Sequence, residues 1–151
     1  MRILAAVSII AVFFFLGQFR FLSIAGVNPN LLLVGLLFFA VKSDKFRLPG
    51  VLLAFSIILV FLFDSAWFLE VAAVLPVAAL FYFLKSFMSG SRFLDFLAGI
   101  AVGTFLLYLL VNPFSFGLPY ALISLEVLYN LTAGILLWVV FERLFAARRV
   151  L

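Results

Sequence analysis

Residues 31–63 read LLLVGLLFFAVKSDKFRLPGVLLAFSIILVFLF, which is two apolar runs separated by one short charged break. The break contains three basic residues, Lys42, Lys45 and Arg47. An apolar helix of about 20 residues spans the hydrocarbon core of a membrane, and Lys and Arg in short loops stay preferentially on the cytoplasmic side. We therefore expect a hairpin of two membrane helices, over residues 29–41 and 48–63, joined by a cytoplasmic loop.

The same alternation of apolar runs and basic breaks continues along the whole chain. Every Lys and Arg except Arg20 falls in one of four groups. The groups are Arg2; Lys42, Lys45 and Arg47; Lys85 and Arg92; and Arg143, Arg148 and Arg149. Because these groups occupy alternate breaks, they predict that both termini lie in the cytoplasm and that the number of crossings is even.

The composition predicts the same environment. Hydrophobic residues make up 69% of the 151 residues and charged residues 11%, and the mean hydropathy is +1.43. Soluble domains contain about 45–50% apolar and about 25% charged residues. We expect one integral membrane domain, residues 1–151, folded as an all-α bundle of about six transmembrane helices. The expected helices cover residues 3–19, 29–41, 48–63, 65–87, 93–111 and 120–141.

The second expected helix is short for a membrane crossing. It begins near Pro29, which suits a first turn because its missing N–H would be unpaired there in any case. Irregular backbone survives at membrane depth only where protein covers it. Either residues 19–25 also lie partly in the membrane, or this helix ends in a thinned or protein-covered region.

Charge and residue types argue against several functional classes. The net charge of +4 is divided among helix ends, which favours orientation in the membrane and anionic lipid headgroups over nucleic acid. The chain has no Cys and no His, which excludes disulfides, thiolate metal sites and the commonest general base. Asp64 and Glu70 flank a helix break that fixes no distance between them, and no nucleophile accompanies them. We predict no catalytic, cofactor or metal site and no enzyme activity.

Three small or polar residues form a stripe in the last expected helix. Glu126, Asn130 and Gly134 follow one another at four-residue steps, so a carboxyl group, an amide and a gap share one helix face. An unpaired charge in hydrocarbon costs at least about 2.5 kcal/mol, so this face should turn inward or toward a partner helix. It is either a ligand-contacting or helix-docking stripe, or it carries a carboxyl group near the external interface, protonated or paired within the bundle.

A second stripe, Asp95, Gly99 and Gly103, lies in the fifth expected helix. Gly99 and Gly103 form a GxxxG motif, whose small residues let two helix backbones approach closely. The approaching helix is either another helix of the bundle or part of another membrane protein. Asp95 suits the first turn of its helix, where a carboxylate complements the N-terminus beside Arg92.

Three short motifs resemble those of a known family. They are Val27-Asn28-Pro29-Asn30 before the apolar residues 31–34, Phe63-Asp64 at the end of the third expected helix, and Leu128-Tyr129-Asn130 followed by Gly134 and a basic tail. Together with the length, the six expected helices and the cytoplasmic termini, they resemble the bacterial rod shape-determining MreD family over essentially the whole chain. The glycines that usually flank the family's aspartate are absent around Asp64.

The resemblance implies a non-enzymatic scaffold subunit of the cell-elongation complex in the bacterial plasma membrane. Such a subunit binds the bitopic shape protein MreC and, through it, the polymerase and transpeptidase that build the wall, and it helps to regulate cell shape and peptidoglycan synthesis. No cofactor or small-molecule substrate is implied. The residues that match the family are Pro29, Asn30, Asp64, Tyr129 and Asn130. We expect the fifth or sixth helix to dock the MreC helix at surfaces that include Gly99, Gly103 and Glu126.

The alternative is a substrate-binding subunit of an energy-coupling-factor vitamin transporter, which this chain resembles in its architecture of about six helices only. A pocket open to the outside would then be lined by four polar or aromatic residues, Glu126, Asn130, Asn112 and Trp67. Those subunits resemble one another in a first helix of small residues that docks the transporter core. Residues 13–15 of this chain are all Phe, which favours the shape-protein interpretation.

Overall fold

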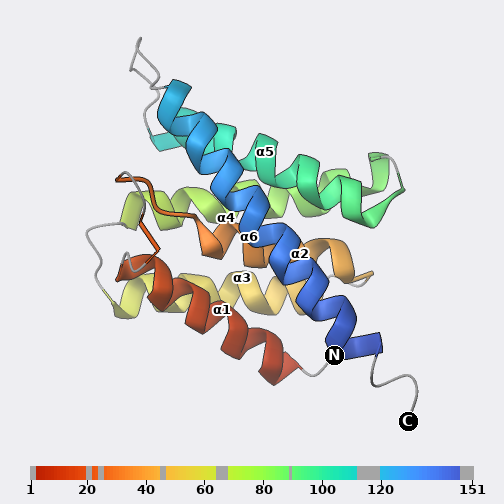
Figure 1. Ribbon diagram of the computed structural model, residues 1–151. Helices are drawn as coiled ribbons and strands as arrows, with labels where there is room; N and C mark the ends of the chain where they lie inside the picture. The colour runs from red at the N-terminus through yellow and green to blue at the C-terminus, as the bar shows by residue number, and fades with distance from the viewer. Residues whose placement is uncertain are drawn as a thin grey trace.

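The computed structural model describes residues 3–19, 22–23, 26–44, 47–63, 68–88, 90–111 and 120–146 (Figure 1). Within these ranges the chain forms six α-helices and a short 3-10 helix, and no β-strand. The helices are α1 (Ile3–Gln18), α2 (Leu31–Lys42), α3 (Arg47–Leu62), α4 (Phe68–Leu84), η1 (Lys85–Phe87), α5 (Arg92–Val111) and α6 (Tyr120–Ala146). The all-α prediction is therefore confirmed.

Each helix expected from the sequence has a counterpart, and the differences lie at the ends. The described part of the fourth helix begins at Phe68, so its expected start at residue 65 lies outside the described residues, and its last expected residues tighten into η1. The sixth helix continues to Ala146, five residues past the expected end at 141. No Gly or Pro follows Phe141 to stop it, so the helix extends beyond its apolar stretch.

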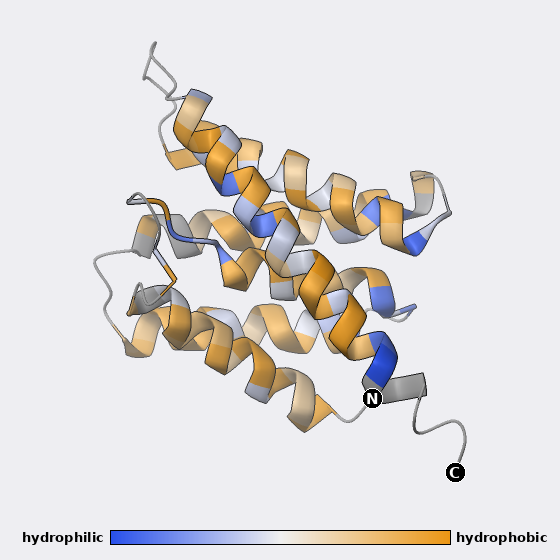
Figure 2. Cartoon of the chain, in the orientation of Figure 1, coloured by the Kyte–Doolittle hydropathy of each residue, from blue (hydrophilic) through white to orange (hydrophobic). Residues whose placement is uncertain are grey.

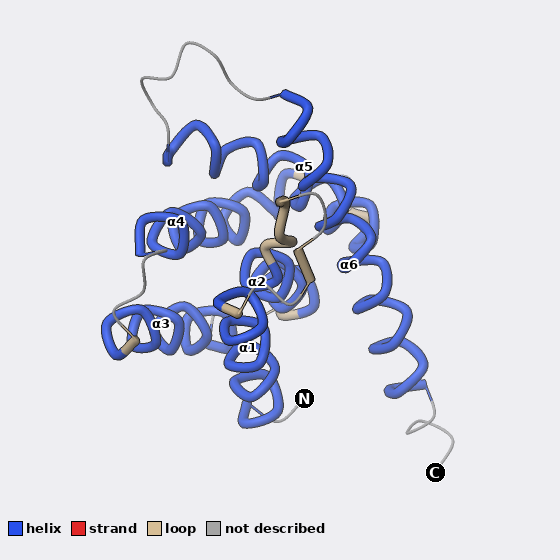
Figure 3. The backbone as a smooth tube through the Cα atoms, turned by 60° about the vertical axis from the view of Figure 1, so that its left-hand side comes forward, coloured by secondary structure: helices blue, strands red, loops and turns tan. Residues whose placement is uncertain are grey.

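Helix α2 lies at the centre of the bundle, with the other five helices around it (Figure 3). Every residue from Leu31 to Val41 is buried, on all sides of the helix. With 12 residues α2 is about 18 Å long, which is well short of a hydrocarbon core of about 30 Å. Because Val27 and Pro29 before it are buried as well, the structure supports the protein-covered alternative for the start of this helix.

Aromatic rings join α2 to α5 and α6 near the C-terminal end of α2. The ring of Phe38 in α2 lies 5.7 Å from that of Phe96 in α5, and 4.7 Å from that of Phe141 in α6. Both contacts are edge-on, the geometry that aromatic quadrupoles favour. Packing of this kind holds helices together even in lipid, where burial of apolar surface supplies little net driving force.

The outer surface of the bundle carries many large apolar side chains. Figure 2 shows hydrophobic residues along all the helices, and hydrophilic residues at the ends of α2, α5 and α6, before α2 and within the first half of α6. Leu4, Phe61 and Leu69 are each at least 70% exposed. Soluble monomers rarely expose apolar surface on this scale.

Two helices, α5 and α6, are long and apolar enough to cross a membrane by themselves. The other apolar helices have between 10 and 17 residues. Only 17% of the apolar window of α6 is buried inside the protein, against 39% for α5, so α6 is the more open of the two. The long apolar helices and the apolar outer surface indicate a membrane protein.

Candidate functional site

Asn130, in the middle of α6, is the centre of a buried polar network. Its side chain is fully buried. The Oδ1 atom accepts a hydrogen bond of 2.7 Å from the backbone N–H of Asn30, and the Nδ2 atom donates one of 2.9 Å to Oγ1 of Thr104 in α5. The Thr104 hydroxyl donates in turn to the carbonyl oxygen of Ile100 at 2.8 Å. One amide therefore connects α6 to α5 and to the start of α2.

Asn30 caps the N-terminus of α2. Its side-chain oxygen accepts from the N–H of Leu33 at 3.0 Å, and its carbonyl oxygen accepts from the N–H of Val34 at 3.1 Å. A helix N-terminus leaves backbone donors without partners, and in hydrocarbon each unpaired one costs several kcal/mol. The Asn30 side chain and the Asn130 amide thus satisfy two such groups at the buried start of α2, the N–H of Leu33 and the N–H of Asn30.

The carboxyl group of Glu126 is half-buried and paired within the bundle. Its Oε2 atom accepts a hydrogen bond of 2.7 Å from the hydroxyl of Tyr108 in α5. Glu126 lies one turn before Asn130 in α6, and Tyr108 lies one turn after Thr104 in α5. The two hydrogen-bonded pairs are therefore adjacent steps along one antiparallel helix contact.

The same contact continues through two further steps. A Cβ added to Gly134 would lie 2.5 Å from the Cδ1 atom of Ile100. The Ile100 side chain therefore packs directly against the Gly134 backbone, where any larger side chain would overlap it. The Trp138 ring stacks on Phe96 with 5.7 Å between centroids. The complete set, which we name the α5–α6 seam, pairs Glu126 with Tyr108, Asn130 with Thr104, Gly134 with Ile100, and Trp138 with Phe96. The seam gives every residue of the predicted α6 stripe a partner in α5.

The predicted glycine stripe of α5 faces a different helix. A Cβ on Gly99 would overlap the Phe81 ring of α4, and one on Gly103 would lie 3.3 Å from Val77 of α4. Both glycines are buried, and so is Asp95 in the first turn of α5. The close helix approach that this spacing predicts thus takes place inside the chain, between α5 and α4, and these glycines present no outward surface.

Three consecutive residues at the C-terminal end of α2 each contact a different helix end. Lys42 forms an ion pair with Glu142 of α6, and its Nζ atom lies 3.8 Å from the centroid of the Trp138 ring. The carbonyl oxygen of Ser43 accepts a hydrogen bond from Nζ of Lys85 in η1. The carboxylate of Asp44 forms an ion pair with Arg92 of α5, with 2.9 Å between Oδ1 and the guanidinium nitrogen. This segment, the 42–44 hub, places three of the predicted cytoplasmic basic residues at one end of the bundle.

Lys85 also donates to the carbonyl oxygen of Ala40 at 2.8 Å, so it caps the C-terminal turn of α2. Partial burial lowers the pKa of the Lys85 ammonium, with Arg92 acting in the same direction and Asp44 opposing both. The ion pair between Arg92 and Asp44 is largely exposed, and pairs of this kind contribute about 0–1 kcal/mol. The surface ion pair therefore contributes little to holding this end together.

No protein-family model, curated protein or solved structure matches this chain.

The remaining predicted residues fall into two sets. Pro29 is buried before α2, and Tyr129 is half-buried in α6 beside Asn130. Asp64, Trp67 and Asn112, on which further predictions were made, lie outside the described residues. Among the described residues, no group of three or more Asp and Glu side chains is placed to hold a metal ion.

Sequence reasoning missed Thr104 and Tyr108, the α5 partners of the polar stripe. They follow Ile100 at four-residue steps, so the signal that identified the α6 stripe is present in α5 as well. Single hydroxyl groups are a weak signal, because Ser and Thr in a helix can bond to their own backbone. Thr104 does this and also accepts from Asn130.

Proposed function

We propose that this chain is an integral membrane protein that crosses a bacterial plasma membrane six times, with both termini in the cytoplasm. The contacts of the 42–44 hub support this topology, because they bring Lys42, Lys85 and Arg92 to one end of the bundle. In Figure 1, α1 begins and α6 ends at that same end. Helices α1, α3 and α4, with 16 or 17 residues, are about 25 Å long, a mismatch of a few Å that a bilayer accommodates.

Within that membrane, the proposed role is a non-enzymatic scaffold subunit of the cell-elongation complex that binds MreC and, through it, the enzymes of wall synthesis. One observation carries this proposal. The Pro29-Asn30 motif and the Tyr129-Asn130 motif, on which the family resemblance depends, meet in the hydrogen bond between the Asn30 N–H and Asn130 Oδ1. Two motifs that are 100 residues apart in the sequence thus form one structural feature.

The packing supports a scaffold rather than a binder of solutes. Asn130 and Glu126, which the vitamin-transporter alternative would place in an open pocket, bond to Asn30, Thr104 and Tyr108 inside the bundle. Groups that are paired in this way hold helices in register. The apolar outer surface is then the part of the protein available to other membrane proteins, through lateral helix contacts.

The test is a pull-down of the tagged full-length chain from native membranes, with mass spectrometry of the proteins that accompany it. We expect MreC to be enriched over a control pull-down with an unrelated membrane protein of six helices carrying the same tag. Recovery of transporter ATPases instead, together with a melting temperature that rises when vitamins are added, would establish the transporter alternative.

A further inference from the structure

Four helices around α2 have uncharged runs that are short and nearly equal in length. Each run contains no charged or amide side chain and has one immediately before it and one immediately after it. The runs are residues 3–17, 48–63, 71–84 and 96–111, along α1, α3, α4 and α5 in turn. At 1.5 Å per residue they are about 21–24 Å long. Each is therefore well below the thickness of an average hydrocarbon core, which is about 30 Å.

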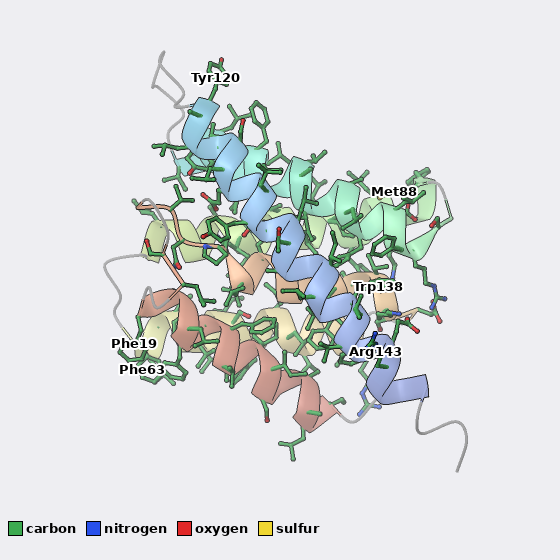
Figure 4. All side chains as sticks on the ribbon, in the orientation of Figure 1. Phe19, Phe63, Met88, Tyr120, Trp138 and Arg143 are labelled. Carbon is green, nitrogen blue, oxygen red and sulfur yellow. The ribbon has the colours of Figure 1, made fainter. Side chains whose placement is uncertain are left out.

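The ends of these runs lie at common levels. At one end of the bundle, the 42–44 hub connects the ends of α2, η1, α5 and α6. At the other end, the ring of Phe63 after α3 lies 5.0 Å from the ring of Phe15 in α1. Figure 4 shows Phe19 and Phe63 at the end of the bundle opposite Arg143. The four runs therefore lie side by side and form one surface, the apolar belt, with a height of about 21–24 Å.

Helix α6 is longer than the belt is high, but it does not require a thicker core. In Figure 1, α6 crosses α3 and α4 obliquely, so its height measured along those helices is less than its length. Its carboxyl group at Glu126 bonds to Tyr108 of α5 inside the bundle. Helix α5 has 20 residues, but Asp95 lies in its first turn, so its uncharged part is shorter than the whole helix.

The lysines of the hub are held where they are. A short helix fits a thick bilayer when its terminal Lys and Arg side chains reach along the membrane normal to the headgroups. Lys85 instead donates to the carbonyl oxygens of Ala40 and Ser43 at the end of α2. The ammonium group of Lys42 lies 3.8 Å from the centroid of the Trp138 ring. These contacts fix the level at which hydrocarbon must end on this side.

We propose that this chain fits a hydrocarbon core of about 24 Å and binds phospholipids with short acyl chains in preference to long ones. In an average bilayer, either the lipids next to the belt are compressed or charged helix ends enter hydrocarbon, and both cost free energy. Short acyl chains avoid both costs. Resting on the six crossings of the proposed function, the inference also gives the scaffold a means of gathering partners. Membrane proteins with equally short helices share one thinned region, which lowers the total cost of thinning.

The experiment measures lipid binding to the full-length chain in vesicles. The lipids are dimyristoleoyl, dioleoyl and dierucoyl phosphatidylcholine, whose monounsaturated chains increase in length in that order. Brominated dioleoyl phosphatidylcholine quenches the fluorescence of Trp67 and Trp138, and each unbrominated lipid competes with it. We expect the dimyristoleoyl lipid to bind roughly threefold more tightly than the dierucoyl lipid, with the dioleoyl lipid between them. An unrelated six-helix protein with apolar runs of about 20 residues should prefer the dioleoyl lipid.

Matched variants test whether the polar ends determine the height of the belt. Gln18→Leu, Arg20→Leu and Asp64→Leu together remove the residues that end the runs along α1 and α3. This triple variant should shift the preference toward the dioleoyl lipid. Ser8→Leu with Thr132→Leu is the control, because it adds apolar side chains at two exposed positions within the belt height and lengthens no run. Its preference should equal that of the unchanged chain. Circular dichroism identifies any variant that fails to fold, in which case the lipid series of the unchanged chain decides alone.

The outcomes separate the belt from the proposed function. Equal binding of the three lipids, or tightest binding of the dioleoyl or dierucoyl lipid, overturns the belt and leaves the six crossings standing. An unchanged preference in a folded triple variant also overturns it. Loss of MreC from the pull-down, with the short-chain preference intact, removes the scaffold role and leaves the belt. Extraction of the chain from vesicles by alkaline carbonate removes the six crossings and the belt with them.

Discussion

At the scale of single residues, Asn130 can be replaced by no other side chain without loss. Its oxygen accepts from the Asn30 N–H, and its nitrogen donates to a Thr104 oxygen whose own hydrogen is used on Ile100. A neutral amide provides an acceptor and a donor at these two positions at any pH. Ionised aspartate at residue 130 would keep the acceptor but lose the donor, and leucine would lose both.

We therefore predict that Asn130→Leu lowers the free energy of unfolding by about 1–2 kcal/mol, at the upper end of the range for hydrogen bonds between membrane helices. Asn130→Asp should fall between Asn130→Leu and the unchanged protein. The measurement is SDS-titrated unfolding in mixed micelles. Thr132→Val is the control, because that exposed hydroxyl bonds only within its own helix. Equal unfolding curves for Asn130→Leu and the unchanged protein would show that the network contributes nothing.

The hydrogen bond between Tyr108 and Glu126 can be measured by a double-mutant cycle. Tyr108→Phe and Glu126→Gln should each destabilise the protein, and the two together should cost less than their sum by about 0.6–1.7 kcal/mol. Tyr129→Phe combined with Glu126→Gln provides the comparison, because Tyr129 forms no hydrogen bond with Glu126 in the structure. If the first pair is as additive as this second one, the two side chains do not interact.

At the scale of the helices, hydropathy identified the six elements but not their arrangement. The central helix α2 and the outer helices are both made almost entirely of apolar residues, because lipid and protein interior select similar side chains. Burial on all sides of α2 therefore leaves no trace in its sequence. The α6 side of the seam could be predicted, because polar side chains such as Glu126 and Asn130 are costly in hydrocarbon and should face the interior. Which helix would face them depends on packing across the whole bundle.

Steric fit at the third step of the seam gives a prediction about α5 and α6. Gly134→Leu should destabilise the protein by about 1–3 kcal/mol, because the new side chain would overlap Ile100 and approach Phe96. Ile100→Ala in the same chain should restore part of the loss by making room. The control is Gly17→Leu, since a Cβ on Gly17 would meet no atom within 4 Å. If Ile100→Ala adds to the loss instead of relieving it, the two residues do not face each other.

At the scale of the whole molecule, the 42–44 hub ties α2, α5, α6 and η1 together at one end. Lys85 contributes through hydrogen bonds to the carbonyl oxygens of Ala40 and Ser43 at the end of α2. We predict that Lys85→Met lowers the free energy of unfolding by about 1–3 kcal/mol, because it leaves these carbonyl groups without their donor. Lys85→Arg should restore most of the stability in the same unfolding assay. If Lys85→Arg loses as much stability as Lys85→Met, then the compact shape of the ammonium group matters more than its ability to donate hydrogen bonds.

The hub also bears on the proposed topology. Lys42, Lys85, Arg92 and Glu142 meet at one end of the bundle, so under the six-helix proposal the breaks near them lie on one side of the bilayer, which their basic residues predict to be the cytoplasmic side. Green fluorescent protein fused to the N-terminus or to the C-terminus should therefore fluoresce, because it folds in the cytoplasm. Alkaline phosphatase inserted at residues 112–119 should be active, because that enzyme requires the external compartment, and inactive when fused after residue 151. Activity of the C-terminal phosphatase fusion, with a fluorescent N-terminal fusion, would make the number of crossings odd and would contradict both the hub and the basic pattern.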